Sequence, residues 1–330
     1  MTNFSNISES PVQFTRRNLF KSAAAGAATM ATAGLSVAQA APKKEGTYAN
    51  NGAPEALRIR NDRISDENKK TLMALPCKYV PVAVKFYAVK PENFGLKYKH
   101  TDKRMSLCQF VSYAQKTHSS FYIDKTNEDC MGRTVLGMVQ EPPLGASGQA
   151  GFDFGVFRNQ DANSRLYYNI PIAIRDTINY VIFSPIDQCE FNPDVVVFVG
   201  DSDMADIVMR ATSYISGDLW ESKSSSVLSC AWTYMYTWLS GKVNHCQTGM
   251  HHGMGRRKVY PKGLHIVSVP YQKLDEVCLA LRQMDWQLIS FRPNDKDQDE
   301  LRRRMRNWNA LSKQINESYS FALPENKVQK

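Results

Sequence analysis

The sequence predicts a mixed α/β fold. From about residue 66 onward, short apolar runs typical of strands alternate with segments of helical periodicity. About 290 residues follow position 40, enough for one large domain or two closely packed ones with a sizeable core. None of the later segments is apolar enough to span a bilayer.

Strands are expected where apolar and β-branched residues cluster, over 80–87, 121–123, 178–183, 195–199 and 266–269. Helices are expected where apolar residues recur at helical spacing, over 104–117, 201–216, 272–284 and 298–316. Asp201 and Gly217 supply capping chemistry for the second of these helices. The aromatic segment 226–240 is compatible with either helix or strand, and 134–139 with a short helix.

The N-terminus has the pattern of a twin-arginine export signal. Arg16 and Arg17 precede an uncharged, Ala-rich run that ends in Ala38-Gln39-Ala40, a small-x-small cleavage site. We therefore expect export by the twin-arginine translocase, cleavage near Ala40 and a periplasmic product. This route carries folded proteins, which hints at a cofactor inserted in the cytoplasm. Fast folding and export together with a partner are the alternatives.

The expected organisation has four parts. Residues 1–40 form the signal peptide, 41–65 a polar linker, 66–290 the main domain, and 291–330 a basic amphipathic helix and tail. The formal net charge is +9, and part of it lies in the arginines of 302–306. Nucleic acid is an implausible partner for an exported protein, and a solvated helix face explains these charges more simply than an anionic lipid or acidic protein.

Seven cysteines leave at least one thiol unpaired in an oxidising compartment. Four of the cysteines form a weak internal repeat. Cys108 and Cys130 follow one predicted strand, and Cys230 and Cys246 follow another. Two related half-units could therefore face each other and bring four thiols to one site.

Thiolates bind iron–sulfur clusters and zinc because sulfur is soft and its charge balances the metal. Gly132 would let backbone N–H groups approach a cluster near Cys130, and Arg133 and Arg256 would lower the cost of its negative charge. No Cys-x-x-Cys spacing occurs. Two disulfides, Cys108–Cys130 with Cys230–Cys246 or the crossed pairs, remain an alternative, as do haem and free buried thiols.

The stretch "NHCQTGMHHGMGRRK" at 244–258 is rich in soft ligands. His245 and Cys246 could ligate zinc or copper, Cys246 alone could join a cluster, and a His or Met could be an axial haem ligand. A polar surface loop is the simplest alternative. His251 and His252 are adjacent and would not both point inward on a strand, so at most one of them is expected to be functional.

Hydrolytic chemistry finds little support, because the chain has no Gly-x-Ser-x-Gly elbow, His-Glu-x-x-His helix or phosphate-binding Gly-rich loop. No acid, base or nucleophile set identifies an enzyme.

Four segments together resemble the domain of unknown function 169 family: "PVAVKFY", "SLCQFVSYAQKTHSSFYIDKTNEDCMGRTVLGM", "SPIDQCEFNPDVVVFVGDSDMADIVMRATSYISG" and "GMGRRKVYPKGLHIVSVPYQKL". The resemblance covers roughly residues 67–285 and implies a shared domain without a settled activity. The His-Cys-x4-His-His pattern around position 246 departs from it and puts Cys246 in doubt as a fourth cluster ligand.

The leading hypothesis is an exported protein that holds an iron–sulfur cluster through Cys108, Cys130, Cys230 and Cys246, acting in electron transfer or serving a periplasmic oxidoreductase. One alternative is a cofactor-free, disulfide-stapled binding or accessory protein, with an aromatic pocket drawn from Trp220, Trp232, Tyr234, Tyr236 and Trp238. A further alternative is a zinc or copper site centred on His245 and Cys246.

Overall fold

The computed structural model describes residues 63–94, 97–140 and 143–286, and seven positions between 303 and 313. The expected signal peptide, nearly all of the linker and most of the C-terminal helix lie outside these residues. The chain divides into two compact units, Met1–Arg282 and Gln283–Lys330. All strands among the described residues and the candidate site below belong to the first unit, and its fold is mixed α/β, as the sequence predicts.

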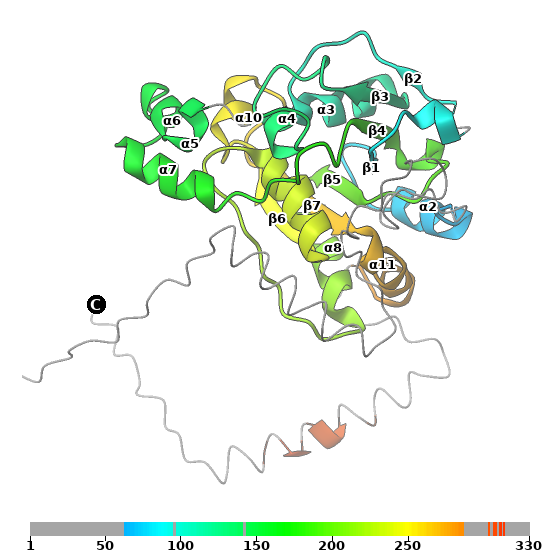
Figure 1. Ribbon diagram of the computed structural model, residues 1–330. Coiled ribbons are helices and arrows are strands. Elements are labelled where there is room, and N and C mark those ends of the chain that lie inside the picture. Colours follow the sequence, from blue (N-terminus) through cyan, green and yellow to red (C-terminus); the bar gives the residue numbers. More distant parts are fainter. Residues whose placement is uncertain are drawn as a thin grey trace, which may run out of the picture. The chain divides into compact units, whose positions relative to one another are not determined.

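A seven-stranded sheet organises the described part of the first unit (Figure 1). Its order is β2-β3-β4-β1-β5-β7-β6, and every pair is antiparallel except β2 with β3. The strands are β1 (Val82–Tyr87), β2 (Lys99–His100), β3 (Phe121–Asp124), β4 (Tyr180–Pro185), β5 (Val195–Gly200), β6 (Asn244–Gln247) and β7 (His265–Pro270). Strands β1 and β5 occupy central positions and are buried along their whole length.

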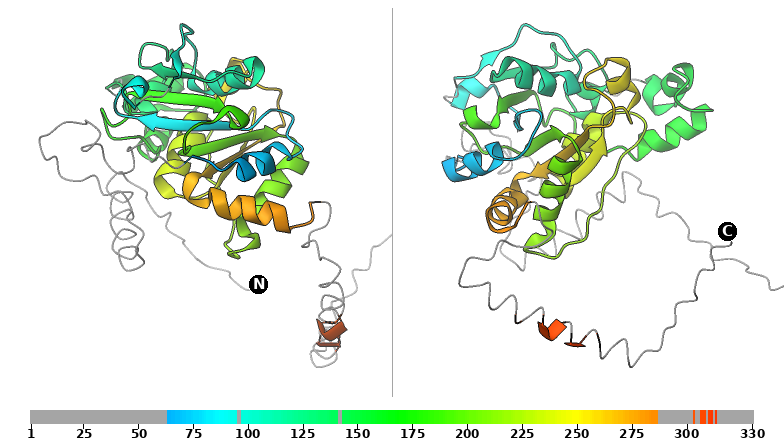
Figure 2. Two further views of the ribbon diagram at one scale, coloured as in Figure 1. Left: turned by 90° about the vertical axis from the view of Figure 1, so that its right-hand side faces the viewer. Right: turned by 180° about the vertical axis from the view of Figure 1, so that it is seen from behind.

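Helices cover both faces of this sheet (Figure 2). The longer ones are α2 (Asp66–Met73), α3 (Leu107–Thr117), α7 (Gln160–Tyr168), α8 (Ser202–Tyr214) and α11 (Tyr271–Gln283). The short ones are η3 (Pro91–Phe94), α4 (Gly132–Val135), α5 (Pro143–Ala146), α6 (Gln149–Asp153), η4 (Ile186–Gln188), η5 (Ala231–Tyr236), α9 (Thr237–Ser240) and α10 (His252–Arg256).

The two faces of the sheet carry different side chains, because successive residues of a strand point to opposite sides. Val195, Val197 and Val199 pack with α3, α4 and η5 in the main hydrophobic core, together with Ile266 and Cys246. The alternate residues of the same strands face the other side. The face with α3 and η5 carries the candidate site.

The expected strands and the three expected helices within the described part of the first unit are confirmed, with ends shifted by a few residues. Asp201 caps α8 by accepting a hydrogen bond from the Met204 N–H. Residues 229–240 of the ambiguous segment are helical and contain a six-residue π-helix, η5. Two strands were not expected: β2, and β6 within the stretch read as a possible loop. The two related half-units remain a prediction.

No helix in the described part of the chain has the length and apolar character needed to cross a bilayer.

Candidate thiol site

Cys108 lies in the first turn of α3. The capping residue Ser106 donates its backbone N–H to Gln109 Oε1 at 3.1 Å, which fixes the start of the helix. The Ser106 hydroxyl lies 3.3 Å from the Cys108 sulfur. The thiol is therefore held beside the positive end of an 11-residue helix, where negative charge is stabilised.

The loop 127–130 is pinned against the same helix end. The Met105 N–H donates to the Asn127 carbonyl at 2.9 Å, and the Asp129 N–H donates to the Met105 carbonyl at 3.1 Å. The Asn127 side chain adds hydrogen bonds to the carbonyls of Thr101 and Lys103. This pairing brings the loop that carries Glu128 and Cys130 next to α3.

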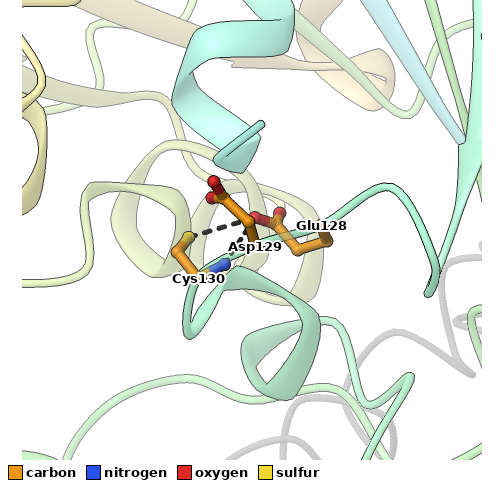
Figure 3. Close-up of side chains that lie close together, drawn as sticks. All are labelled: Glu128, Asp129 and Cys130. Atoms are coloured by element: carbon orange, nitrogen blue, oxygen red, sulfur yellow. Dashed lines mark hydrogen bonds between the residues drawn. The ribbon is translucent and has the colours of Figure 1, made fainter. Parts of the chain in front are cut away.

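Glu128 is the most deeply buried acid in this loop, with 0% of its surface exposed. Its Oε1 accepts hydrogen bonds from the Cys130 N–H at 3.3 Å and from the Cys130 thiol at 3.1 Å (Figure 3). Its Oε2 is buried and has no hydrogen-bond partner. Burial raises the pKa of Glu128 to about 7, although the hydrogen bonds from Cys130 oppose the shift. An unpartnered buried carboxylate oxygen is unusual and calls for an explanation.

Cys230 enters the site from a different segment, immediately before the π-helix η5. Leu228, two residues earlier, has a positive φ of 54°. Left-handed backbone at a non-glycine residue and π-helical turns are both strained or rare, and both cluster at functional sites. These two features place the Cys230 sulfur in the core, where the residue is only 5% exposed.

The three thiols are near enough to interact electrostatically. Burial raises the pKa of Cys230 well above its usual value, and the charges of Cys130, Glu128 and Cys108 raise it further. Burial likewise raises the pKa values of Cys108 and Cys130, with Glu128 adding to both. In the metal-free protein these thiols are therefore neutral at neutral pH. The backbone N–H of Leu107 lowers the pKa of Glu128 and of Cys130, although it makes no hydrogen bond of normal geometry to Glu128 Oε2.

A small cavity adjoins two of these thiols. Cys108 and Cys230 line it, with the side chains of Ser229, Thr233, Tyr234 and Tyr260 and apolar residues of α3, β5 and β7. It has room for about one water molecule. Of the five aromatic residues considered for a pocket, only Tyr234 is among the residues that line this cavity, while Trp220 is 54% exposed.

Among the described residues, one trio of potential metal ligands has all its ligand atoms within 4.8 Å of one another: Glu128, Asp129 and Cys130 (Figure 3). The three thiols do not meet that spacing as a set. A single tetrahedral ion needs sulfurs only about 4 Å apart. The sulfurs of the three thiols are thus spaced more widely than a single metal ion would require.

Cys246 lies in the same hydrophobic core as Cys230, and its place as a fourth ligand stays a prediction. It lies on β6, and its neighbour is the Thr233 hydroxyl, while none of the other three thiols influences its pKa. Burial raises the pKa of Cys246 to about 12. Glu128, which sequence reasoning missed, accepts a hydrogen bond from the Cys130 thiol and raises the pKa of Cys108, Cys130 and Cys230. Its one sequence signal is its position two residues before Cys130.

The structure places some of the glycine and arginine residues predicted to assist a cluster at the thiols and others away from them. The Gly132 N–H donates to the Cys130 sulfur at 3.3 Å, so Gly132 is part of the site. Arg133 is half-buried on α4. Arg256 instead lies over the Phe154 ring, 5.7 Å from its centroid. The arginine near the thiols is Arg257, which lowers the pKa of Cys108 and forms an ion pair with Asp129 at 3.0 Å.

The histidines of 244–258 are spread over different environments. His251 is buried, whereas His252 is exposed. His245 is adjacent to Cys246 on β6, so their side chains point to opposite faces of the sheet. A zinc or copper site that uses both His245 and Cys246 is therefore excluded by the strand geometry.

All seven cysteines are free thiols. The disulfides considered from the sequence, Cys108–Cys130 and Cys230–Cys246 or the crossed pairs, are absent from the structure. Cys189 and Cys278 are buried, and burial raises the pKa of each to about 12.

Comparison with known proteins identifies the domain that carries these thiols. A family model described as DUF169, uncharacterised ArCR, matches residues 72–279. The chain belongs to this family. An uncharacterized protein of Methanocaldococcus jannaschii is 24% identical over 218 residues, which cover 65% of this chain and 92% of that protein. No solved structure matches. The matched range includes Cys108, Glu128, Cys130 and Cys230, so the whole thiol site lies within the family domain.

Proposed function

We propose that this protein binds an iron–sulfur cluster through Cys108, Cys130 and Cys230, with Glu128 at the fourth position. The observation that carries the proposal is the convergence of three thiols and one buried carboxylate, from three separate segments, at the N-terminus of α3. A cluster suits this set better than a single ion, because its ligands are spread more widely around it than the ligands of one metal.

The chemistry of the donors supports a cluster. Three soft thiolates hold iron well, and Glu128 offers a free Oε2 as a harder fourth ligand. The Gly132 N–H already donates to the Cys130 sulfur, an interaction of the kind that tunes cluster potentials.

The electrostatics support an anionic group as well. The end of α3 and Arg257 contribute positive charge near Cys108. Binding would require the thiols to ionise, so it releases protons. The small cavity beside Cys108 and Cys230 would have to widen as the sulfurs turn toward iron.

The proposed role of the cluster is electron transfer, or service to a partner oxidoreductase in the periplasm. The Arg16-Arg17 signal motivates the location, because its export route accepts folded, cofactor-loaded proteins. Replacing both arginines by Lys should keep the precursor in the cytoplasm, and intact mass of the wild-type periplasmic product should show cleavage near Ala40. Equal export of the variant would contradict this part of the proposal.

The cluster itself is tested by anaerobic purification from the producing cell. Stoichiometric iron and sulfide, with broad visible absorption that bleaches on reduction, are expected for the wild type. Cys108→Ser, Cys130→Ser and Cys230→Ser should each lose most of the iron and the absorption. A colourless, iron-free wild type would overturn the proposal.

Cys246→Ser and Cys278→Ser are the matched controls, since both residues are buried cysteines outside the proposed ligand set. They should keep the full iron content. Loss of iron in Cys246→Ser equal to that in Cys230→Ser would show that the ligand set is wrong. Glu128→Gln should retain the three thiolates and bind iron less tightly, with an altered spectrum.

A further inference from the structure

Two histidines meet on neighbouring strands, on the sheet face opposite the thiol site. His245 Nε2 lies 2.7 Å from His265 Nδ1, and the two rings are stacked with an interplanar angle of 20°. His265 Nε2 in turn lies 3.2 Å from the hydroxyl of Ser202, the first residue of α8. The three side chains come from β6, β7 and the helix that follows β5.

The register of the sheet explains why the two histidines are in contact. His245 pairs with Val267 and His265 pairs with Gln247, so the two histidines are diagonal neighbours on one face of the β6–β7 ladder. Their neighbours in the chain, Cys246 and Ile266, are directly opposite one another and point into the main core. The pair is therefore separate from the thiol site.

Both imidazoles are half-buried at the edge of the sheet, and Ser202 is exposed. The pair is therefore accessible to ions from solvent without any opening of the core. A second contact holds the backbone of His245 in addition to its pairing with β7. The His245 N–H donates a hydrogen bond to Ser222 Oγ at 3.2 Å.

The geometry is near that of a chelated metal ion. Metal–nitrogen bonds of about 2.0–2.1 Å at ordinary coordination angles separate two imidazole nitrogens by about 2.9–3.4 Å. The observed 2.7 Å is that of a hydrogen bond between the two rings, so an ion must displace the shared proton while the nitrogens separate by a few tenths of an ångström and the rings turn toward it. Imidazole ligands suit zinc and copper in particular.

We propose that His245 Nε2 and His265 Nδ1 chelate a divalent zinc or copper ion, with Ser202 orienting the His265 ring through its other nitrogen, Nε2. Among the described residues no third His, Cys, Asp or Glu atom completes a tight trio with them. Two or more positions on the ion are therefore left for water or an exogenous ligand, and the site is an open one.

Titration of the metal-free mature protein with Co²⁺, followed by displacement with Zn²⁺, tests the proposal. A two-histidine site binds Co²⁺ without sulfur-to-cobalt charge-transfer bands, whereas any ion at the thiol site produces them. The spectrum therefore separates failure of this proposal from failure of the cluster. His245→Gln and His265→Gln should each weaken the sulfur-free binding by at least about tenfold.

His252→Gln is the matched control, because His252 is an exposed histidine of the same stretch. It should bind as the wild type does. Equal affinity of His245→Gln and wild type, or an equal loss in His252→Gln, would overturn the proposal.

A second measurement covers the case in which a variant fails to fold. Zn²⁺ should protect His245 and His265 of the wild type from acylation by diethylpyrocarbonate, read by peptide mass mapping, and leave His252 reactive. Unchanged modification of His245 and His265 with and without Zn²⁺ would contradict the site.

Discussion

At the scale of single residues, position 132 requires glycine because there is no room for a side chain. A Cβ at this position would lie 2.6 Å from Glu128 Oε2 and 2.9 Å from the Leu107 Cβ. Gly132→Ala should therefore displace the buried carboxylate and destabilise the protein by about 1–3 kcal/mol. Denaturant unfolding measures the change.

Gly253→Ala is the control for this substitution. Gly253 lies in α10, and no atom stands within 4 Å of the place that an alanine Cβ would occupy there. The change should be neutral or stabilise by up to about 1 kcal/mol. Equal destabilisation by both substitutions would show that crowding at Glu128 is not the cause.

His251 makes the stability of the protein depend on pH. The residue is 1% exposed, its Nε2 lies 3.0 Å from Ser224 Oγ, and its buried Nδ1 has no hydrogen-bond partner. Burial lowers the pKa of His251 from 6.5 to about 4. Because the unfolded chain binds the proton first, stability is full above pH 6.5 and is lost progressively as the pH falls from there to about 4.

His251→Gln should therefore reduce the loss of stability between pH 7 and pH 4 by up to about 3 kcal/mol. Unfolding midpoints across this range provide the measurement. His252→Gln, at the exposed neighbour, should leave the pH profile of the wild type unchanged. A wild-type profile in His251→Gln would show that the buried imidazole is not responsible.

At the scale of elements, the predicted N-cap of α8 is confirmed, whereas its C-cap is Ile215 and not the expected Gly217. Asp201 accepts from the Met204 N–H at 3.1 Å, as its position before the helix predicts. Asp201→Ala should cost about 1 kcal/mol of unfolding free energy. Asp203→Ala removes an exposed acid of the same turn that does not cap the helix, and should cost less than half as much in the same denaturation assay.

The segment 226–240 shows the limit of element prediction. Its apolar and aromatic residues fit a buried helix and a buried strand equally well, because a short apolar run has no distinct period. The structure makes it a π-helix followed by α9, and all six residues of η5 are buried. Packing against β6 and β7, which lie further along the chain, decides this conformation. The same holds for β6, whose four residues pair with β7.

At the scale of the whole molecule, a buried ion pair links the two central strands. Lys85 on β1 donates to Asp194 Oδ1 at 2.8 Å, and the Phe86 N–H donates to Asp194 Oδ2 at 2.8 Å. Both side chains are less than a tenth exposed. Asp194→Ala leaves a buried ammonium unpaired and should lower the free energy of unfolding by about 3–5 kcal/mol.

The double variant Lys85→Met, Asp194→Asn tests the cause of that loss. It removes both charges and keeps an acceptor for the Phe86 N–H, so it should be more stable than either Asp194→Ala or Lys85→Met alone. Additive losses in a double-mutant cycle of Lys85→Met, Asp194→Asn and their combination, measured by chemical denaturation, would show that the two groups do not act as a pair.

The sequence by itself determined the α/β class, most strands and helices and the family, and it singled out Cys108, Cys130 and Cys230. These follow from local periodicity, capping chemistry and residue type, which the chain carries at each position. Only the tertiary structure decided that Glu128 and Arg257 stand beside those thiols and that His245 contacts His265. The reason is geometric: these contacts join segments far apart in the chain, and only strand register and the packing of the loop 127–130 against the start of α3 bring them together.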